Sequence, residues 1–260
     1  MKRRTQAVLL VLSSLLASGT HGDEAPLPSI ETVLQHLRVM ANQEQGNEGL
    51  FRFRYAFVQT RATRELDAKG RVKKQSTKET RNTPAFVATA YNIPLSSRSS
   101  AAPDSASQNS QPRQEAEAKP FEENDFVLND DLLSRFEMTV LRREQLNGRN
   151  TLLIEFKPAR KKLPSHSLKD RFINKTAGEV WIDEGDWMFS QIDLHLIDSV
   201  NVVGGLVSAV KKFNYRCERQ RTPDALWDSA NIAWHLEGRE HFSRKTLEYQ
   251  ERRTDIKKVR

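Results

Sequence analysis

The chain has 260 residues, of which 41 are Lys or Arg and 34 are Asp or Glu, so its formal net charge is +7 at pH 7. Only 37% of the residues are hydrophobic, and the longest apolar run, residues 7–17, is shorter than the roughly 20 residues of a transmembrane helix. A bundle of membrane-spanning helices is therefore excluded. The single cysteine, Cys217, excludes an intrachain disulfide and argues against a cysteine metal cluster.

The first segment has the layout of a secretory signal peptide. Basic residues 2–4 precede the apolar run, and small residues follow it. We expect cleavage after Gly19 or Gly22, with residues 1–22 removed in the latter case to leave a periplasmic protein. The alternative, an uncleaved membrane anchor, conflicts with the shortness of the run.

A short amphipathic helix is predicted next, with Ser29 as its N-cap. Its apolar residues recur at helical spacing, and they are Ile30, Val33, Leu34, Leu37 and Met40. The polar residues 42–49 predict a break after this helix. A hairpin turn at residues 67–70, with Gly70 at positive φ, leads to a polar strand over residues 72–80.

Before that turn, the hydrophobic period changes from 3.6 to 2. Aromatic residues alternate with cations or small residues, and they are Phe51, Phe53, Tyr55 and Phe57. This alternation predicts a half-buried strand with an aromatic face.

Residues 96–120 differ from the rest of the chain in composition. They contain no apolar side chain larger than Ala and are rich in Ser, Pro, Gln and Glu. Such a segment cannot bury enough surface to offset its ordering entropy, so we expect a disordered loop inside a single domain of residues 23–260. The alternative, an interdomain linker, requires a core of its own in the preceding residues, where none is visible.

The remaining sequence predicts a succession of antiparallel strands. Asn147 and Gly148 predict one hairpin, and a turn at residues 184–186 precedes a strand whose Met188, Ile192 and Leu194 share a face. Further strands are predicted over residues 213–220, 226–236 and 245–260. The fold class expected is mainly β with a few helices: one strongly curved antiparallel sheet, an incomplete β-barrel, with helices against its concave face.

Residues 202–210 interrupt this pattern because their valines and Leu206 follow helical spacing around Gly204 and Gly205. We expect a short apolar helix there. It is either a plug that fills the interior or a mobile lid over a cavity.

The chain resembles the bacterial outer-membrane lipoprotein-sorting family, the LolA-like lipoprotein carriers. The order and spacing of several short pieces carry the resemblance, at residues 55–61, 66–72, 147–149, 156–158, 178–183, 204–206, 213–216 and 226–227. The resemblance implies an exported carrier or chaperone that binds a lipid or an acylated lipoprotein in an apolar cavity. The cavity-lining residues it implies are Phe51, Phe53, Tyr55, Phe57, Met138, Val140, Leu152, Ile154, Met188, Ile192, Leu194, Val203, Leu206 and Val207.

Patterns typical of catalysis or cofactor binding are absent from the sequence, so an enzyme, a cofactor and a metal are not expected. The histidines lack the spacing that places two imidazoles on one metal, and there is no G-x-S-x-G elbow or glycine-rich phosphate loop. Cys217 is expected to pack inward as a small hydrophobic residue.

The basic residues do not form a nucleic-acid surface, because their runs are short, scattered and interleaved with acidic residues. Peripheral contact with anionic membrane headgroups suits them better. Two hypotheses remain: a lipid-binding carrier with an apolar cavity, and a module with a filled barrel that docks an envelope membrane protein.

Overall fold

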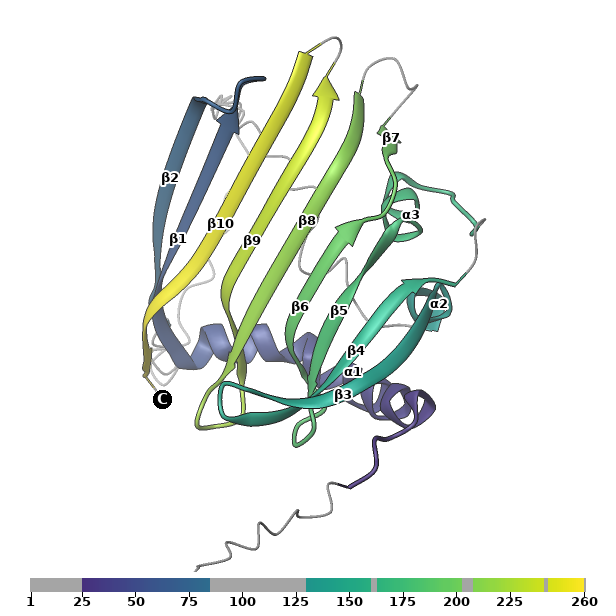
Figure 1. Cartoon of the computed structure of the whole chain (residues 1–260). Helices are drawn as coiled ribbons and strands as arrows, with labels where there is room; N and C mark the ends of the chain where they lie inside the picture. The colour runs from purple at the N-terminus through teal and green to yellow at the C-terminus, as the bar shows by residue number, and fades with distance from the viewer. Residues whose placement is uncertain (1–24, 85–129, 160–162, 203–207, 241–242, 260) are drawn as a thin grey trace, which may run out of the picture.

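The computed structural model describes residues 25–84, 130–159, 163–202, 208–240 and 243–259. Most of these residues belong to one sheet (Figure 1). In chain order the elements are α1 (Ile30–Arg54), β1 (Tyr55–Leu66), β2 (Val72–Asn82), α2 (Asp130–Ser134), β3 (Phe136–Leu146), β4 (Arg149–Pro158), α3 (Leu168–Ile173), β5 (Thr176–Asp183), β6 (Phe189–Leu196), β7 (Val200–Val202), β8 (Ser208–Arg221), β9 (Trp227–Glu240) and β10 (Ser243–Lys258).

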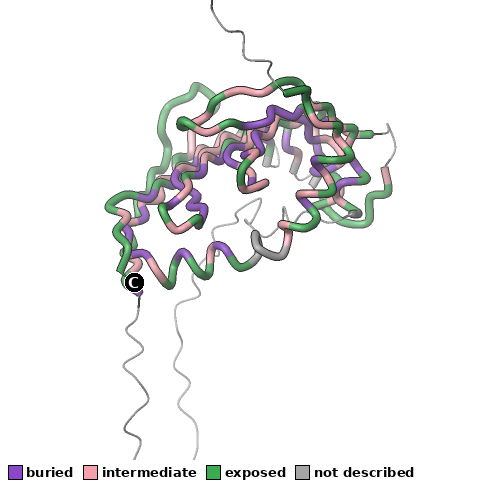
Figure 2. Tube along the Cα trace, turned by 90° about the horizontal axis from the view of Figure 1, so that it is seen from below, coloured by how far each residue is buried: buried purple, intermediate pink, exposed green. Residues whose placement is uncertain are grey.

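The strands form a 10-stranded antiparallel sheet in the order β2-β1-β10-β9-β8-β6-β5-β4-β3, with β7 paired to the start of β8. The edge strands β2 and β3 do not pair with each other, so the sheet is open. Seen from below, it curves around α1, which crosses its concave side (Figure 2). The predicted fold class, a curved and incompletely closed antiparallel sheet with helices against its concave face, is confirmed.

The helix α1 begins where the sequence predicts but is longer than predicted. The Ser29 hydroxyl accepts a hydrogen bond from the Thr32 N–H at 3.2 Å, as an N-cap does. The helix then continues through residues 42–49 to Arg54, so the predicted break is wrong. Asn47 in this stretch is buried against the sheet, and this tertiary contact stabilises a helix that its polar sequence alone does not indicate.

Phe51 and Phe53 consequently lie in the last turns of α1 and not in a strand. Residues two apart point to opposite sides of a helix, whereas they share a face of a strand. Phe51 is fully buried and Phe53 is 46% exposed. The strand alternation begins only at Tyr55, which with Phe57 and Phe51 packs around Leu226.

The first half of α1 packs on the concave face. Its Val33 and Leu37 contact Leu152, Ile154 and Ile182 of β4 and β5 in one apolar cluster. These side chains are all at most 6% exposed, so this part of the concave face is filled.

The second half of α1 is held to the sheet by polar contacts. The Asn47 amide donates to the Trp227 carbonyl and accepts from the Trp227 N–H at 2.8 Å, as a neighbouring strand would do. Beside it, the buried guanidinium of Arg253 donates to Glu48 of α1 at 2.7 Å and to Asp228 of β9 at 2.7 Å. A charged network therefore joins the helix to β9 and β10.

The predicted hairpin turns are confirmed. Gly70 has a φ of 77°, and Asn147 and Gly148 have φ values of 53° and 75°. Two successive positive φ values are those of a type I′ turn, whose twist matches that of the flanking strands. These turns are determined by local sequence, which is why they could be predicted.

The prediction of a helix at residues 202–210 is wrong for the residues at its two ends that the structure describes, because they belong to strands. Val200 opposes Val210, and Val202 opposes Ser208, in an antiparallel ladder between β7 and β8. Valine is stiff at χ1 and favours extended backbone, which outweighs the helical spacing here. Residues 203–207 lie outside the described residues.

The expected signal peptide, residues 1–22, and the expected disordered loop, residues 96–120, also lie outside the described residues. Neither α2 nor α3 was predicted. Among the described helices, none is long and apolar enough to cross a membrane. Cys217 is buried, as expected.

The turn between β5 and β6 depends on a buried carboxylate. Asp183, 1% exposed, accepts hydrogen bonds from Arg149 at 2.6 and 2.7 Å and from the N–H groups of Gly185 and Asp186 at 3.0 and 2.8 Å. Burial raises the pKa of Asp183, but these bonds to Arg149 and the backbone outweigh it and hold the pKa below its usual value.

Because its pKa is lower in the folded than in the unfolded chain, Asp183 stabilises the fold above about pH 4 and loses this effect as the pH falls further. We expect Asp183→Asn to lower the free energy of unfolding by about 2–3 kcal/mol at neutral pH. Urea denaturation at several pH values measures this. The difference from wild type should shrink as the pH falls below about 4, and a difference independent of pH would contradict the assignment.

Candidate functional site

A continuous row of mostly apolar side chains crosses the concave face from β10 to β3. Each member opposes the next across a strand ladder, so all point to the same face. We name this row the concave strip, and its members are Tyr249, Trp234, Tyr215, Leu194, Gly178, Phe156 and Met138.

The aromatic rings of the concave strip contact one another. Trp234 and Tyr249 stack with ring centroids 5.2 Å apart and an interplanar angle of 10°. Phe213, which neighbours the strip on β8, has its ring 6.5 Å from Tyr215 and 6.3 Å from Trp234. On the other side, Phe172 of α3 meets Phe213 edge-on at 6.5 Å. The rings therefore form a stacked apolar surface between α3 and β10.

Part of this surface stays accessible. Tyr215 and Trp234 are only partly buried, and so are Met138, Leu236 and Ile192 beside them. Phe156 and Leu194, in contrast, are 6% and 5% exposed. The strip thus has a packed base and a half-open aromatic surface.

The β10 end of the concave strip is polar. Glu251, two residues after Tyr249, is 5% exposed and accepts hydrogen bonds from the Tyr249 hydroxyl at 2.5 Å, from Arg61 at 2.9 Å and from the Gln59 amide. Burial raises the pKa of Glu251, but these three donors outweigh it and lower the pKa below its usual value. Glu251 is therefore an anion that holds Arg61 at the margin of the strip.

The structure brings together some of the residues predicted to line a cavity and separates others. Those on the concave face are Met138, Val140, Leu152, Ile154, Ile192 and Leu194. Leu152 and Ile154 lie beneath α1, whereas Met138 and Ile192 border the half-open surface.

The other predicted residues lie elsewhere. Phe51, Tyr55 and Phe57 form a separate cluster at the end of α1, and Phe53, on the other side of the helix from Phe51, is 46% exposed. Met188 is buried in the segment between β5 and β6. Val203, Leu206 and Val207 lie outside the described residues.

Sequence reasoning missed the aromatic centre of the strip, Tyr215, Trp234 and Tyr249. The signal was present as alternation in strands that were predicted, since Phe213, Tyr215 and Cys217 share a face. What the sequence lacked was the register that aligns one ring from each strand.

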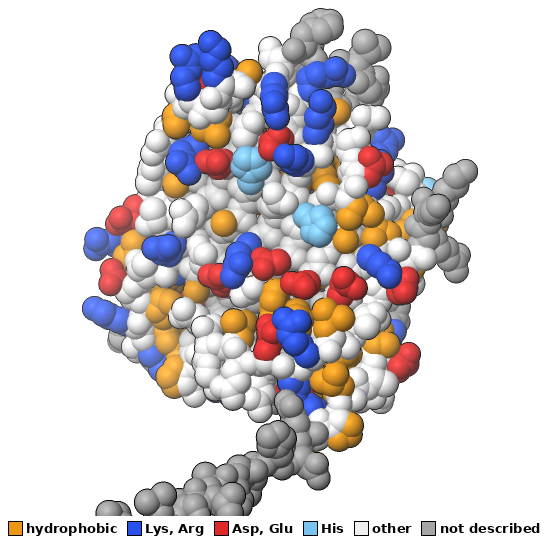
Figure 3. All heavy atoms as spheres, viewed as in Figure 1, with side chains coloured by type: hydrophobic (Ala, Val, Ile, Leu, Met, Phe, Trp, Pro, Cys, Tyr) orange, Lys and Arg blue, Asp and Glu red, His pale blue; other side chains and the backbone are white. Residues whose placement is uncertain are grey.

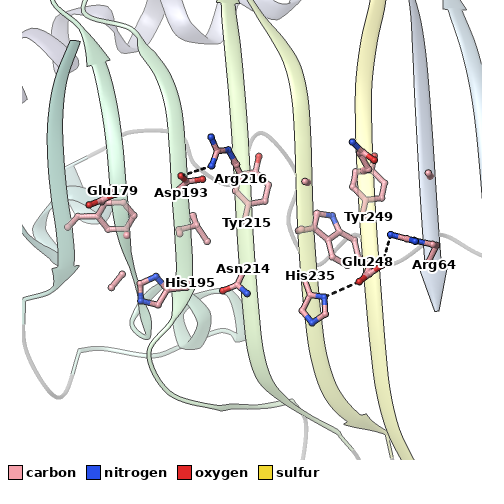
Figure 4. Close-up of a pocket in the computed structure, with 18 of the residues that line it drawn as sticks. Arg64, Glu179, Asp193, His195, Asn214, Tyr215, Arg216, His235, Glu248 and Tyr249 are labelled. Carbon is pink, nitrogen blue, oxygen red and sulfur yellow. Dashed lines mark hydrogen bonds and ion pairs between the residues drawn. The ribbon is translucent and has the colours of Figure 1, made fainter. Parts of the chain in front are cut away.

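The opposite, convex face carries many charged side chains and histidines (Figure 3). It holds an open groove of about 1190 Å³, whose lining residues Figure 4 shows. Its two walls are cross-strand rows of outward side chains. One wall contains Gln250, Arg216, Asp193, Glu179 and Glu155 together with Ala62 and Ala233, and the other contains Arg64, Glu248, His235, Asn214, His195 and Ala177.

The charges of this convex groove largely neutralise one another. Arg64 contacts Glu248 at 2.8 Å, and Arg216 contacts Asp193 at 3.4 Å. His235 lies 3.5 Å from Glu248. The walls of the convex groove are therefore lined by paired charges. Within the described residues, no group of three or more His, Cys, Asp or Glu is placed to hold a metal ion.

No family model and no curated protein matches the chain. A solved lipoprotein-sorting protein domain from Vibrio parahaemolyticus is similar at 14% identity and a TM-score of 0.33, over 87% of this chain and 93% of that one. A LolA superfamily protein from Nitrosomonas europaea is similar at 9% identity and a TM-score of 0.30, over 90% of this chain and 94% of that one. A DUF1329 family protein from Desulfovibrio piger has 10% identity and a TM-score of 0.31, with the same coverage. The first two bear the family name that the sequence resemblance gives, and similarity this low carries no functional argument.

Proposed function

We propose that this protein is an exported, non-enzymatic binding protein that holds the acyl chain of a lipid or acylated protein against the concave strip. The observation that supports this is a row of contacting rings on the concave side of an open sheet, in which Tyr215 and Trp234 are only partly buried. An acyl chain laid on them gains about 0.8 kcal/mol for each methylene removed from water.

The strip suits an acyl chain because it is long, narrow and uncharged. It runs across the strands from Met138 to Tyr249, and its only ionisable side chains are those of Tyr215 and Tyr249. The apolar neighbours Ile192 and Leu236 widen the surface on either side. The walls of the convex groove, in contrast, carry charged side chains, among them Arg64, Asp193 and Glu248.

A specific observation favours a second candidate, docking of an envelope membrane protein. Val39, Leu50 and Phe53 of α1 are 65%, 46% and 46% exposed. Their spacing of eleven and three residues places them on one stripe of the helix, away from the sheet. A protein partner would cover this stripe and would not require the concave strip.

The proposed acyl binding is tested with ligand-stripped protein and a fluorescent fatty acid. We expect saturable binding, which Tyr215→Glu abolishes because a carboxylate on the strip must be desolvated beneath the chain. The matched control is Asn214→Glu, which adds the same charge to the next residue on the opposite face. It should bind as wild type does.

Both variants are compared only where circular dichroism shows a folded chain. If wild-type protein takes up no acyl probe, or if both variants lose binding equally, the concave strip is not an acyl site and the docking function should replace it.

A further inference from the structure

Cations gather on the concave face where the sheet ends in β1 and β2. Glu251 shares the face of Tyr249, since they are two residues apart on one strand. Glu251 opposes Arg61 on β1, and Arg61 opposes Lys78 on β2. Lys74, four residues before Lys78 on the same strand, lies on that face too. We name Arg61, Lys74 and Lys78 the cationic end of the concave strip.

The cationic end carries more positive charge than the two carboxylates on the same face, Glu251 and Glu65, can neutralise. Arg61 contacts buried Glu251 at 2.9 Å. Glu65, which opposes Lys74 in the β1–β2 ladder, contacts Lys73 at 3.4 Å. Both lysines of the cationic end are exposed, and within the described part of the chain neither makes an ion pair. A ligand anion would therefore meet two available ammonium groups.

The opposite end of the strip has no such charge. Met138 and Phe156 end it on β3 and β4, with Phe136 edge-on to Phe156 at 5.2 Å. Along the sheet the concave face therefore changes from aromatic and aliphatic to cationic. Neighbouring strands are about 4.8 Å apart, so β2 lies about 10 Å beyond Tyr249 of β10. One ligand of the length of a lipid spans both regions.

We propose that the ligand is an anionic amphiphile, whose acyl chain lies along the concave strip and whose phosphate or carboxylate lies at Lys74 and Lys78. This inference rests on the proposed acyl binding and specifies its substrate class. The buried Glu251 takes part by holding Arg61 in place, so that the lysines and not Arg61 provide the available charge. Lysine suits this role because its flexible stem follows a mobile headgroup.

The experiment compares single-chain amphiphiles of equal chain length that differ only in headgroup: an alkyl phosphate, a fatty carboxylate and a neutral monoacylglycerol. We expect wild-type protein to bind the two anions more tightly than the neutral compound, with the preference declining at high salt. The phosphate and carboxylate arms show which of the two headgroups the site prefers.

The variant Lys74→Gln/Lys78→Gln should weaken binding of the anions about 10-fold and leave the neutral amphiphile unchanged. The matched control, Arg81→Gln/Lys157→Gln, removes the same charge from convex-face positions of β2 and β4. It should leave all three affinities unchanged.

Three results would overturn the inference: equal affinity of wild type for charged and neutral amphiphiles, equal losses in both double variants, or an unchanged anion affinity in the lysine variant. In each of these cases acyl binding itself survives. If wild type binds none of the three compounds, the proposed function fails and the inference fails with it.

Discussion

Arg253→Met should lower the free energy of unfolding by about 3–5 kcal/mol, because it removes the cation from a buried charged network. The Arg253 side chain is 1% exposed, and its partner Asp228 is fully buried. Burial lowers the pKa of Arg253, but the hydrogen bonds and charges of Glu48 and Asp228 outweigh it and raise that pKa. Without Arg253, the Asp228 carboxylate loses the charge that compensates its desolvation.

Methionine keeps much of the volume of the arginine stem, so the expected loss is electrostatic and not a packing defect. Burial raises the pKa of Asp228 even with Arg253 present. In the variant, the cost of the unpaired carboxylate should therefore fall once it is protonated. The stability difference from wild type should be largest at neutral pH and smaller in acid.

The control for this prediction is Arg252→Met. Arg252 is the next residue of β10, is exposed and lies on the opposite face. Its replacement should change stability by less than about 0.5 kcal/mol. Urea denaturation measures the free energy of unfolding of both variants. If Arg253→Met were as stable as Arg252→Met, the buried network would contribute nothing to the stability of the fold.

The sequence predicts those features that depend on neighbouring residues. The hairpin at Asn147 and Gly148 follows from two residues that tolerate positive φ, and the N-cap at Ser29 follows from one hydroxyl. Strand alternation likewise places Ile192 and Leu194 on one face. Each of these inferences needs only a few adjacent residues, and each is confirmed.

Features that depend on distant residues could not be predicted. The helix α1 extends past its polar stretch because Asn47 meets Trp227, which is 180 residues away. Similarly, Glu251 joins Gln59 across 192 residues, and only the pairing of β1 with β10 brings them together. Both the concave strip and its cationic end are products of strand register, which no local pattern specifies.

Gly178→Ala should destabilise the protein by about 3 kcal/mol or more, at the upper end of what overpacking costs. Gly178 lies within the concave strip on β5, opposite Leu194 of β6. An added Cβ would lie 2.1 Å from the carbonyl oxygen of Asp193 and 2.8 Å from the Cα of Leu194. These are backbone atoms of a paired strand, so the clash is relieved only by separating β5 from β6.

Gly46→Ala provides the matched control for this glycine. No atom lies within 4 Å of a Cβ added at Gly46, which is in the exposed part of α1. Alanine there should stabilise the protein by about 0.5–1 kcal/mol, because it reduces the entropy of the unfolded chain and favours the helix. Both substitutions add one methyl group. If urea denaturation shows that Gly178→Ala lowers the free energy of unfolding and Gly46→Ala raises it, the difference reflects the space available to that methyl group at each site. If Gly178→Ala were as stable as wild type, β5 and β6 would not approach as closely as the structure has them, and the strip would not be continuous at its centre.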